Sequence, residues 1–180
     1  MAETVLEDIN CYHEPFIGGG AVFLGLRPRK AIINDLNKEL IFTYRCVKKD
    51  PQKLFDLICT KRNTKEFFLE ERRKDRSPDF HECSEFERAA RLIYLNKTCF
   101  NGMWRENGKG HFNVPYADND MKPDKFLNLR NALNVSEFLN KSDVEILNET
   151  YSDALSRVQR NDLVYLDPPY MPISDTSSFT

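Results

Sequence analysis

The chain has 180 residues, a length that fits one domain, or one domain carrying an inserted subdomain. Its 26 basic and 28 acidic residues leave a net charge of −2, so contact with nucleic acid would require a local positive patch. No apolar run is long enough for a membrane span, and residues 1–10, which carry three acids and no Lys or Arg, are not expected to form a secretory signal. The five cysteines, with no Cys-x-x-Cys spacing, are typical of reduced thiols in a cytoplasmic protein and not of a disulfide framework.

Residues 1–50 have the pattern that opens a Rossmann-like α/β unit. A short strand at 11–14 leads into the turn Pro15–Gly20, which a short apolar helix follows. A second strand at 31–33 ends at Asn34–Asp35, and a helical repeat of apolar residues comes next. Strand, glycine turn, helix, strand, acid and helix in this order favour a nucleotide-binding fold.

Residues 51–135 differ in character and predict a mainly helical insert. Helices are expected at 51–59, 64–74 and 84–95. The stretch 64–76 mixes both signs of charge, which favours a solvated helix. Residues 98–115 are rich in Asn and Gly with aromatic residues between them, and they predict a hairpin or an ordered loop.

Residues 136–180 return to α/β character. Strands are expected at 144–147 and 163–166, and the second is almost continuously apolar, as a buried parallel strand would be. The string Asp167-Pro168-Pro169-Tyr170 follows it directly. The expected fold class is therefore an α/β domain interrupted by a helical insert.

Two features of the first region are open to two interpretations. Gly18, Gly19 and Gly20 let the backbone approach a ligand closely, but they also suit a plain turn. Asp35 stands where a Rossmann-like site binds a ribose diol, but it also suits the cap of the next helix.

The string Asp167–Tyr170 is the most specific pattern in the chain. Consecutive prolines cannot continue a central strand or a helix, so the backbone must leave the sheet in a stiff extended turn. Such a turn fixes a carboxylate and a carbonyl side by side with an aromatic ring, an arrangement that suits an amino group on a stacked base. The alternative is a structural Pro-Pro turn with a capping Asp.

Four motifs in order resemble those of the Dam-type DNA N6-adenine methyltransferases, most closely the members that methylate GATC. These motifs are Glu14–Gly20, Asn34–Asp35, Phe112–Tyr116 and Asp167–Tyr170. The resemblance implies a Rossmann-like S-adenosylmethionine-dependent methyltransferase fold, 1–50 and 136–180, with an inserted DNA-recognition subdomain, 51–135. It also implies double-stranded DNA as the partner.

The resemblance assigns cofactor-binding roles residue by residue. Asp35 would bind the ribose hydroxyls of S-adenosylmethionine, Tyr151 would pack on its adenine, and Thr150 stands where some relatives carry an Asp that binds the adenine amine. The implied cofactor-binding set is Pro15, Phe16, Gly18, Gly20, Asp35, Thr150 and Tyr151.

The implied catalytic set is Asp167, Pro168, Pro169 and Tyr170. Asp167 and the Pro168 carbonyl would accept hydrogen bonds from the adenine amine, and Tyr170 would stack on the flipped base. Flipping is required because an in-plane pocket cannot reach N6 inside a duplex. No general base is needed before the amine attacks the methyl group, and no metal is expected.

Residues 88–110 contain five basic residues and one acid, so this stretch carries about +4. It suits phosphate contact, or alternatively a solvated helix face and loop. By resemblance, Arg105 would read a guanine, Phe100 would wedge into the space left by the flipped base, and Asn101 would meet the orphaned thymine. The implied DNA-binding set, in which Met103 and Pro115 would touch thymine methyls, is Arg91, Lys97, Phe100, Asn101, Met103, Arg105, Asn113 and Pro115.

Three departures from the family pattern shape the remaining expectations. Ala117–Asp120 replaces a Gly and a basic residue, and nothing before Tyr12 matches the N-terminal motif that closes over the cofactor. The sequence also stops shortly after the Pro-Pro turn, so we expect a truncated chain that could self-associate to complete its core. A non-catalytic remnant that binds DNA or cofactor, and an RNA adenine methyltransferase, remain the alternatives; Asp rather than Asn at 167 disfavours a protein-glutamine target.

Overall fold

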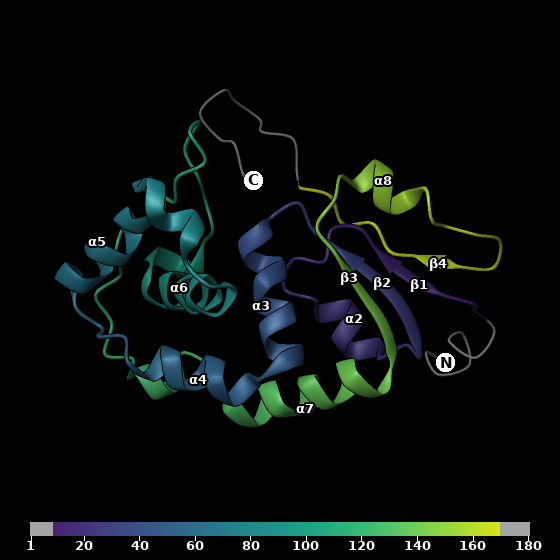
Figure 1. Cartoon of the computed structure of the whole chain (residues 1–180), viewed down its shortest axis with the longest axis horizontal. Coiled ribbons are helices and arrows are strands. Elements are labelled where there is room, and N and C mark those ends of the chain that lie inside the picture. Colours follow the sequence, from purple (N-terminus) through teal and green to yellow (C-terminus); the bar gives the residue numbers. More distant parts are fainter. Residues whose placement is uncertain (1–8, 170–180) are drawn as a thin grey trace. The chain divides into compact units, whose positions relative to one another are not determined.

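A computed structural model describes residues 9–169 of the chain (Figure 1). These residues form two compact units. The described part of unit 1 contains 9–51 and 130–168, and that of unit 2 contains 52–129 together with Pro169. Each unit has its own core and is described separately.

Unit 1 is built on a parallel sheet of four strands in the order β3-β2-β1-β4. The strands are β1 (Tyr12–Glu14), β2 (Lys30–Asn34), β3 (Asp143–Leu147) and β4 (Leu163–Val164). The α/β class expected from the sequence is confirmed. The interpretation of 163–166 as a fully buried strand is wrong: the strand ends at Val164, is half-buried, and lies at an edge of the described sheet, and Leu166 is 54 % exposed.

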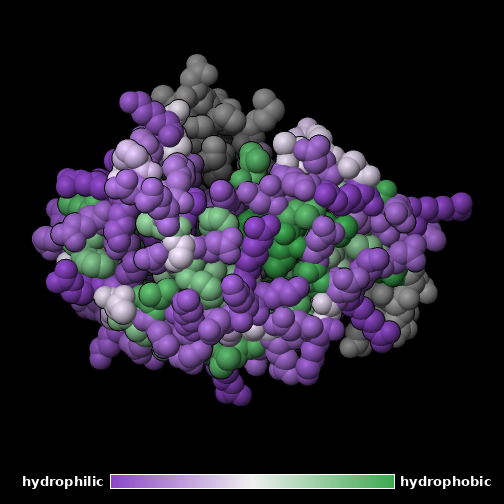
Figure 2. Space-filling model, viewed as in Figure 1, coloured by the Kyte–Doolittle hydropathy of each residue, from purple (hydrophilic) through white to green (hydrophobic). Residues whose placement is uncertain are grey.

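One face of this sheet is covered by α2 (Ala21–Leu26), α3 (Lys38–Lys49) and α7 (Leu129–Lys141). Alternate strand residues point to one face, so Tyr12, Ala31, Ile33 and Val144 join the same core as Phe23, Ile41, Tyr44, Phe138 and Leu139. A space-filling view shows hydrophobic side chains gathered around α3 and β3 on an otherwise largely hydrophilic face (Figure 2). The sequence did not predict α7, and the expected insert boundary at residue 135 lies inside it.

The start of α3 excludes one interpretation of Asp35, that of a cap for this helix. Asn37 is the N-cap residue of this helix, and its side-chain oxygen accepts a hydrogen bond from the Leu40 amide at 3.1 Å. Asp35 is therefore not the N-cap, and its carboxylate lies in the turn before the helix.

Unit 2 contains α5 (Lys65–Arg73), α6 (Glu85–Thr98) and all but the first residue of α4 (Pro51–Cys59). Four short 3₁₀ helices accompany them: η1 (Lys74–Arg76), η2 (Pro78–Glu82), η3 (Phe100–Gly102) and η4 (Pro123–Lys125). The expected capping box at the start of α6 is present: the Ser84 hydroxyl accepts from the Glu87 amide, and the Glu87 carboxylate accepts from the Ser84 amide. No helix among residues 9–169 is both long and apolar enough to cross a membrane.

The segment 99–116 folds back on itself as the predicted hairpin. Antiparallel bridges join Cys99 to Tyr116 and Glu106 to Phe112. Backbone hydrogen bonds run from the Phe100 amide to the Pro115 carbonyl at 2.9 Å and from the Asn113 amide to the Arg105 carbonyl at 3.0 Å. We call residues 99–116 the hairpin.

Candidate functional site

The strand order of unit 1 places two loops side by side at one edge of the sheet. All four strands are parallel, so their carboxyl ends meet at the same edge. β1 pairs with β2 on one side and with β4 on the other, which makes the gap between β1 and β4 the topological switch point. Ligands bind at such points in open α/β sheets. The turn Pro15–Gly20 follows β1 at this point, and Asp167 follows β4.

The glycine turn has a backbone that only glycine adopts without strain. Gly18 and Gly20 have φ values of +45° and +67°. A Cβ on Gly20 would lie 2.4 Å from the Tyr44 hydroxyl oxygen, whereas a Cβ on Gly18 or Gly19 would meet no atom within 4 Å. The Tyr44 hydroxyl donates to the Gly18 carbonyl at 3.0 Å and so braces the turn from below. The turn is thus supported on one side and open on the other, which fits a ligand.

Asp35 is tied to this turn. One carboxylate oxygen accepts from the Gly18 amide at 3.1 Å, and the other accepts from the Asn37 amide at 2.9 Å. Each oxygen has a second lone pair, so the carboxylate can accept further hydrogen bonds from a diol. Leu36, the next residue, is 75 % exposed and places an apolar side chain beside the acid.

Asn34 is a site residue to which the sequence pattern assigns no role. Its side chain is buried, donates to the carbonyls of Pro15 at 3.0 Å and Glu149 at 3.1 Å, and accepts from the Glu149 amide at 2.9 Å. It therefore joins the loops that follow β1 and β3. An asparagine at the end of an apolar strand is the signal that could have revealed this role, because a buried amide needs partners.

An aromatic pair forms the rim above these loops. The rings of Phe16 and Tyr151 stack with centroids 5.6 Å apart, and Tyr151 is 55 % exposed. The Thr150 hydroxyl accepts from the Asp153 amide at 3.2 Å and donates to its carboxylate at 2.6 Å, which caps α8 (Tyr151–Leu155). The rim thus offers flat apolar surface where the loops after β1 and β3 meet.

The Pro-Pro turn begins at this same edge. Asp167 and Pro168 are exposed, Pro169 is grouped with unit 2, and Tyr170 lies outside the described residues. Glu14, at the end of β1, is 3 % exposed and accepts from the Tyr12 hydroxyl at 2.5 Å. Burial raises the pKa of the Glu14 carboxyl, and the charge of Asp167 raises it further. Because β4 pairs directly with β1, Asp167 and Glu14 follow neighbouring strands at this edge of the sheet.

In unit 2, most of the expected DNA-reading residues lie at the surface. Phe100 is 50 % exposed, and Asn101 next to it has a left-handed φ of +55°. The Arg105 Nε donates to the Asn113 side-chain oxygen at 2.7 Å, so these two residues form one polar group on the hairpin. Met103 and Asn113 are half-buried, whereas Lys97, Phe100, Asn101, Arg105 and Pro115 are exposed.

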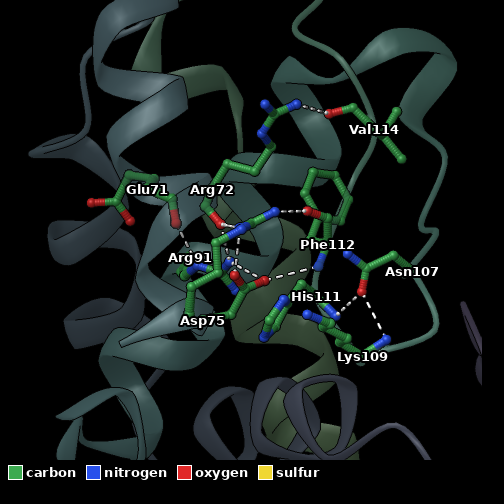
Figure 3. Close-up of polar contacts among 10 residues, drawn as sticks. Glu71, Arg72, Asp75, Arg91, Asn107, Lys109, His111, Phe112 and Val114 are labelled. Atoms are coloured by element: carbon green, nitrogen blue, oxygen red, sulfur yellow. Dashed lines mark hydrogen bonds and ion pairs between the residues drawn. The ribbon is translucent and has the colours of Figure 1, made fainter. Parts of the chain in front are cut away.

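The assignment of Arg91 to the DNA surface is wrong. Its side chain is 3 % exposed and forms an ion pair with Asp75 at 2.9 Å between Nη2 and Oδ2. Its Nε donates to the Glu71 carbonyl at 2.7 Å (Figure 3). A guanidinium that is buried and paired in this way cannot also meet a phosphate. The stretch 64–76 is likewise more than a solvated helix, because it supplies these partners of Arg91.

A family model for D12 class N6 adenine-specific DNA methyltransferases matches residues 2–180. The chain belongs to this family. It is 43 % identical over 176 residues to the type II methyltransferase M1.LlaDCHI of Lactococcus lactis subsp. cremoris, covering 97 % of this chain and 61 % of the relative.

Two further relatives extend the comparison. Identity is 40 % over 190 residues to the type II methyltransferase M.MjaIII of Methanocaldococcus jannaschii, which covers 96 % of this chain and 63 % of that relative. Identity is 34 % over 178 residues to the DNA adenine methylase of Escherichia coli K12, which covers 94 % of this chain and 59 % of that relative. The chain thus spans about three fifths of the length of these family members.

Proposed function

We propose that the chain forms the core of an enzyme that transfers a methyl group from S-adenosylmethionine to N6 of adenine in duplex DNA, in the sequence GATC. One observation carries this proposal: the braced glycine turn with Asp35 and the Pro-Pro turn with Asp167 follow neighbouring parallel strands at one sheet edge. A nucleoside-binding group and an amine-binding group at a switch point are what such a transfer needs.

The residues at this edge fit S-adenosylmethionine. The open side of the glycine turn suits its methionine part, the Asp35 carboxylate suits its ribose hydroxyls, and the Phe16–Tyr151 pair with Leu36 suits its adenine. When bound, the cofactor supplies an electrophilic methyl group. The residues of the chain would hold this methyl group and the adenine amine in the positions that the transfer requires.

The Pro-Pro turn supplies the acceptors for the target amine. The Asp167 carboxylate and the Pro168 carbonyl would take the two N–H groups of adenine N6, which directs the nitrogen lone pair away from the ring plane. Tyr170 would stack on the base. The target base must leave the duplex to reach this turn, so base flipping is part of the proposal. Catalysis then depends on positioning and electrostatic alignment.

Transfer of a tritiated methyl group to matched substrates tests the proposed function. We expect N6-methyladenine in a GATC duplex, and little label in a duplex with the same composition and no GATC. Label mainly in an RNA duplex would favour RNA methylation instead. Cofactor binding without transfer to any substrate would favour a non-catalytic remnant.

Substitution of Asp35 tests the cofactor site. We expect Asp35→Asn to weaken S-adenosylmethionine binding about tenfold, because a charged acceptor of hydrogen bonds is lost while the size of the side chain is kept. Isothermal titration calorimetry measures this change. Asp143→Asn is the matched control, since Asp143 is an exposed acid at the amino end of β3. Equal affinities for the two variants would contradict the assignment of Asp35.

Substitutions of Arg105 and Lys97 separate base reading from phosphate contact. We expect Arg105→Ala to lower discrimination at one guanine about tenfold or more, since a bidentate contact to guanine contributes about 1–3 kcal/mol. Lys97→Ala should instead weaken binding to every duplex about equally. It should also lower the magnitude of the slope of log K against log salt concentration by about one. Binding titrations at several salt concentrations measure both. An Arg105→Ala variant that binds all sequences equally less well would make Arg105 a phosphate contact.

A further inference from the structure

We infer that Asp75 and Arg76, supported by Arg91, position the hairpin and thereby set how well Arg105 discriminates guanine. This inference rests on the proposed function for the reading role of Arg105. None of the three residues is expected to touch DNA bases. They act through Phe112, which lies on the returning strand of the hairpin directly opposite Glu106.

Asp75 is the centre of this contact. Its Oδ2 accepts from the Phe112 amide at 2.8 Å and from Arg91 Nη2 at 2.9 Å (Figure 3). Its Oδ1 accepts from Arg76 Nη1 at 2.7 Å. Both carboxylate oxygens are therefore used. The Asp75 side chain is 9 % exposed and that of Arg91 is 3 % exposed, so these bonds form largely away from water.

Arg76 binds the same residue, Phe112, through its carbonyl. Its Nη2 donates to the Phe112 carbonyl at 3.1 Å, and its Nη1 donates to the Arg72 carbonyl at 2.5 Å. Phe112 is thus held at both its amide and its carbonyl by two adjacent residues of η1. Arg72 binds the same part of the hairpin two residues further on: its Nη1 donates to the Val114 carbonyl at 3.2 Å.

The position of Phe112 is transmitted to Arg105 by short contacts. Asn113, the next residue, accepts from Arg105 Nε and donates its amide to the Arg105 carbonyl. The Trp104 ring lies 4.7 Å from the Phe112 ring, between centroids. A shift of Phe112 therefore moves Asn113, which binds the Arg105 side chain, and Trp104, which precedes Arg105 in the chain. Because guanine is read through two bonds of fixed geometry, a small misplacement weakens discrimination.

Three variants separate positioning of the hairpin from an effect of charge alone and from a purely structural contact. Asp75→Asn keeps the shape but removes the charge that Arg91 and Arg76 share. Arg76→Ala removes the bond to the Phe112 carbonyl together with the Arg76 contacts to Asp75 and to the Arg72 carbonyl, and leaves the bond from the Phe112 amide to Asp75 in place. Arg76→Lys keeps the charge but lacks the planar fork. Arg73→Ala, an exposed arginine one residue before η1, is the matched control.

Trp104 gives a first readout that does not depend on turnover. It is the single tryptophan of the chain, so intrinsic fluorescence reports on the hairpin. We expect a red shift and lower anisotropy for Asp75→Asn and Arg76→Ala, and none for Arg73→Ala, each measured below its own unfolding midpoint. Unchanged fluorescence in both Asp75→Asn and Arg76→Ala would overturn the inference. Since this readout needs no DNA, its failure is distinct from failure of the proposed methylation.

The second readout is base discrimination in the full chain. The ratio of kcat/KM for a GATC duplex to that for a duplex with one guanine replaced should fall about tenfold in Arg76→Ala and in Arg76→Lys, which corresponds to about 1.4 kcal/mol. Cofactor affinity should stay at the wild-type value. Full discrimination in Arg76→Lys would show that only the charge matters, and an unchanged ratio in Arg76→Ala would show a purely structural contact; either result would overturn the inference.

Discussion

Replacement of Asp167 by alanine is expected to lower the rate of methyl transfer to a GATC duplex about 10²- to 10³-fold. The carboxylate is exposed at the carboxyl edge of the sheet, where it can accept from the target amine, and removal of one such aligned group typically costs a factor of this size. Affinity for the cofactor and for DNA should change little, because Asp167 makes neither the ribose contact nor the hairpin contacts.

Single-turnover transfer of tritiated methyl groups measures the effect, with cofactor and DNA affinities determined in parallel. Asp143→Ala is the control, since it removes an exposed acid from the amino end of β3 in the same sheet. Near-normal transfer by Asp167→Ala would contradict the catalytic assignment. A parallel loss of cofactor binding would assign Asp167 to the cofactor site instead.

Replacement of Gly20 by alanine should weaken S-adenosylmethionine binding about 100-fold, or about 2.7 kcal/mol. The added Cβ would collide with the Tyr44 hydroxyl at 2.4 Å, and the left-handed backbone costs a residue with a Cβ about 1–2 kcal/mol in addition. The turn must therefore open, and it would lose the Tyr44 bond to the Gly18 carbonyl that braces it.

A second substitution isolates the collision. In the pair Gly20→Ala with Tyr44→Phe the colliding oxygen is gone, so affinity should recover to within about tenfold of that of Tyr44→Phe alone. Gly25→Ala is the matched control: Gly25 lies in α2 with open space around it, and alanine there favours the helix by about 1 kcal/mol. Calorimetric titration and thermal unfolding of all four proteins test this. If Gly20→Ala binds S-adenosylmethionine as tightly as Gly25→Ala, the proposed role of the glycine turn in cofactor binding is refuted.

The elements that the sequence predicted well are those whose signal is local. The glycine turn, the capping box of α6 and the helical repeat of α4 each depend on residues within one or two turns of chain. The helix α7 was missed, although Phe138 and Leu139 belong to the core, because the apolar residues at 126–139 follow a long irregular stretch that hides their period.

The sequence by itself determined the family, and its residue types and their order predict the chemistry of the site: glycines after the first strand, an acid after the second and a Pro-Pro turn after the fourth. Only the tertiary structure decided which charged residues are free to meet a ligand. Arg91 and Arg105 are alike in the sequence, but one is buried against Asp75 and the other is exposed on the hairpin. Burial and ion pairing depend on contacts between residues such as Asp75 and Phe112, 37 positions apart, which no local pattern encodes.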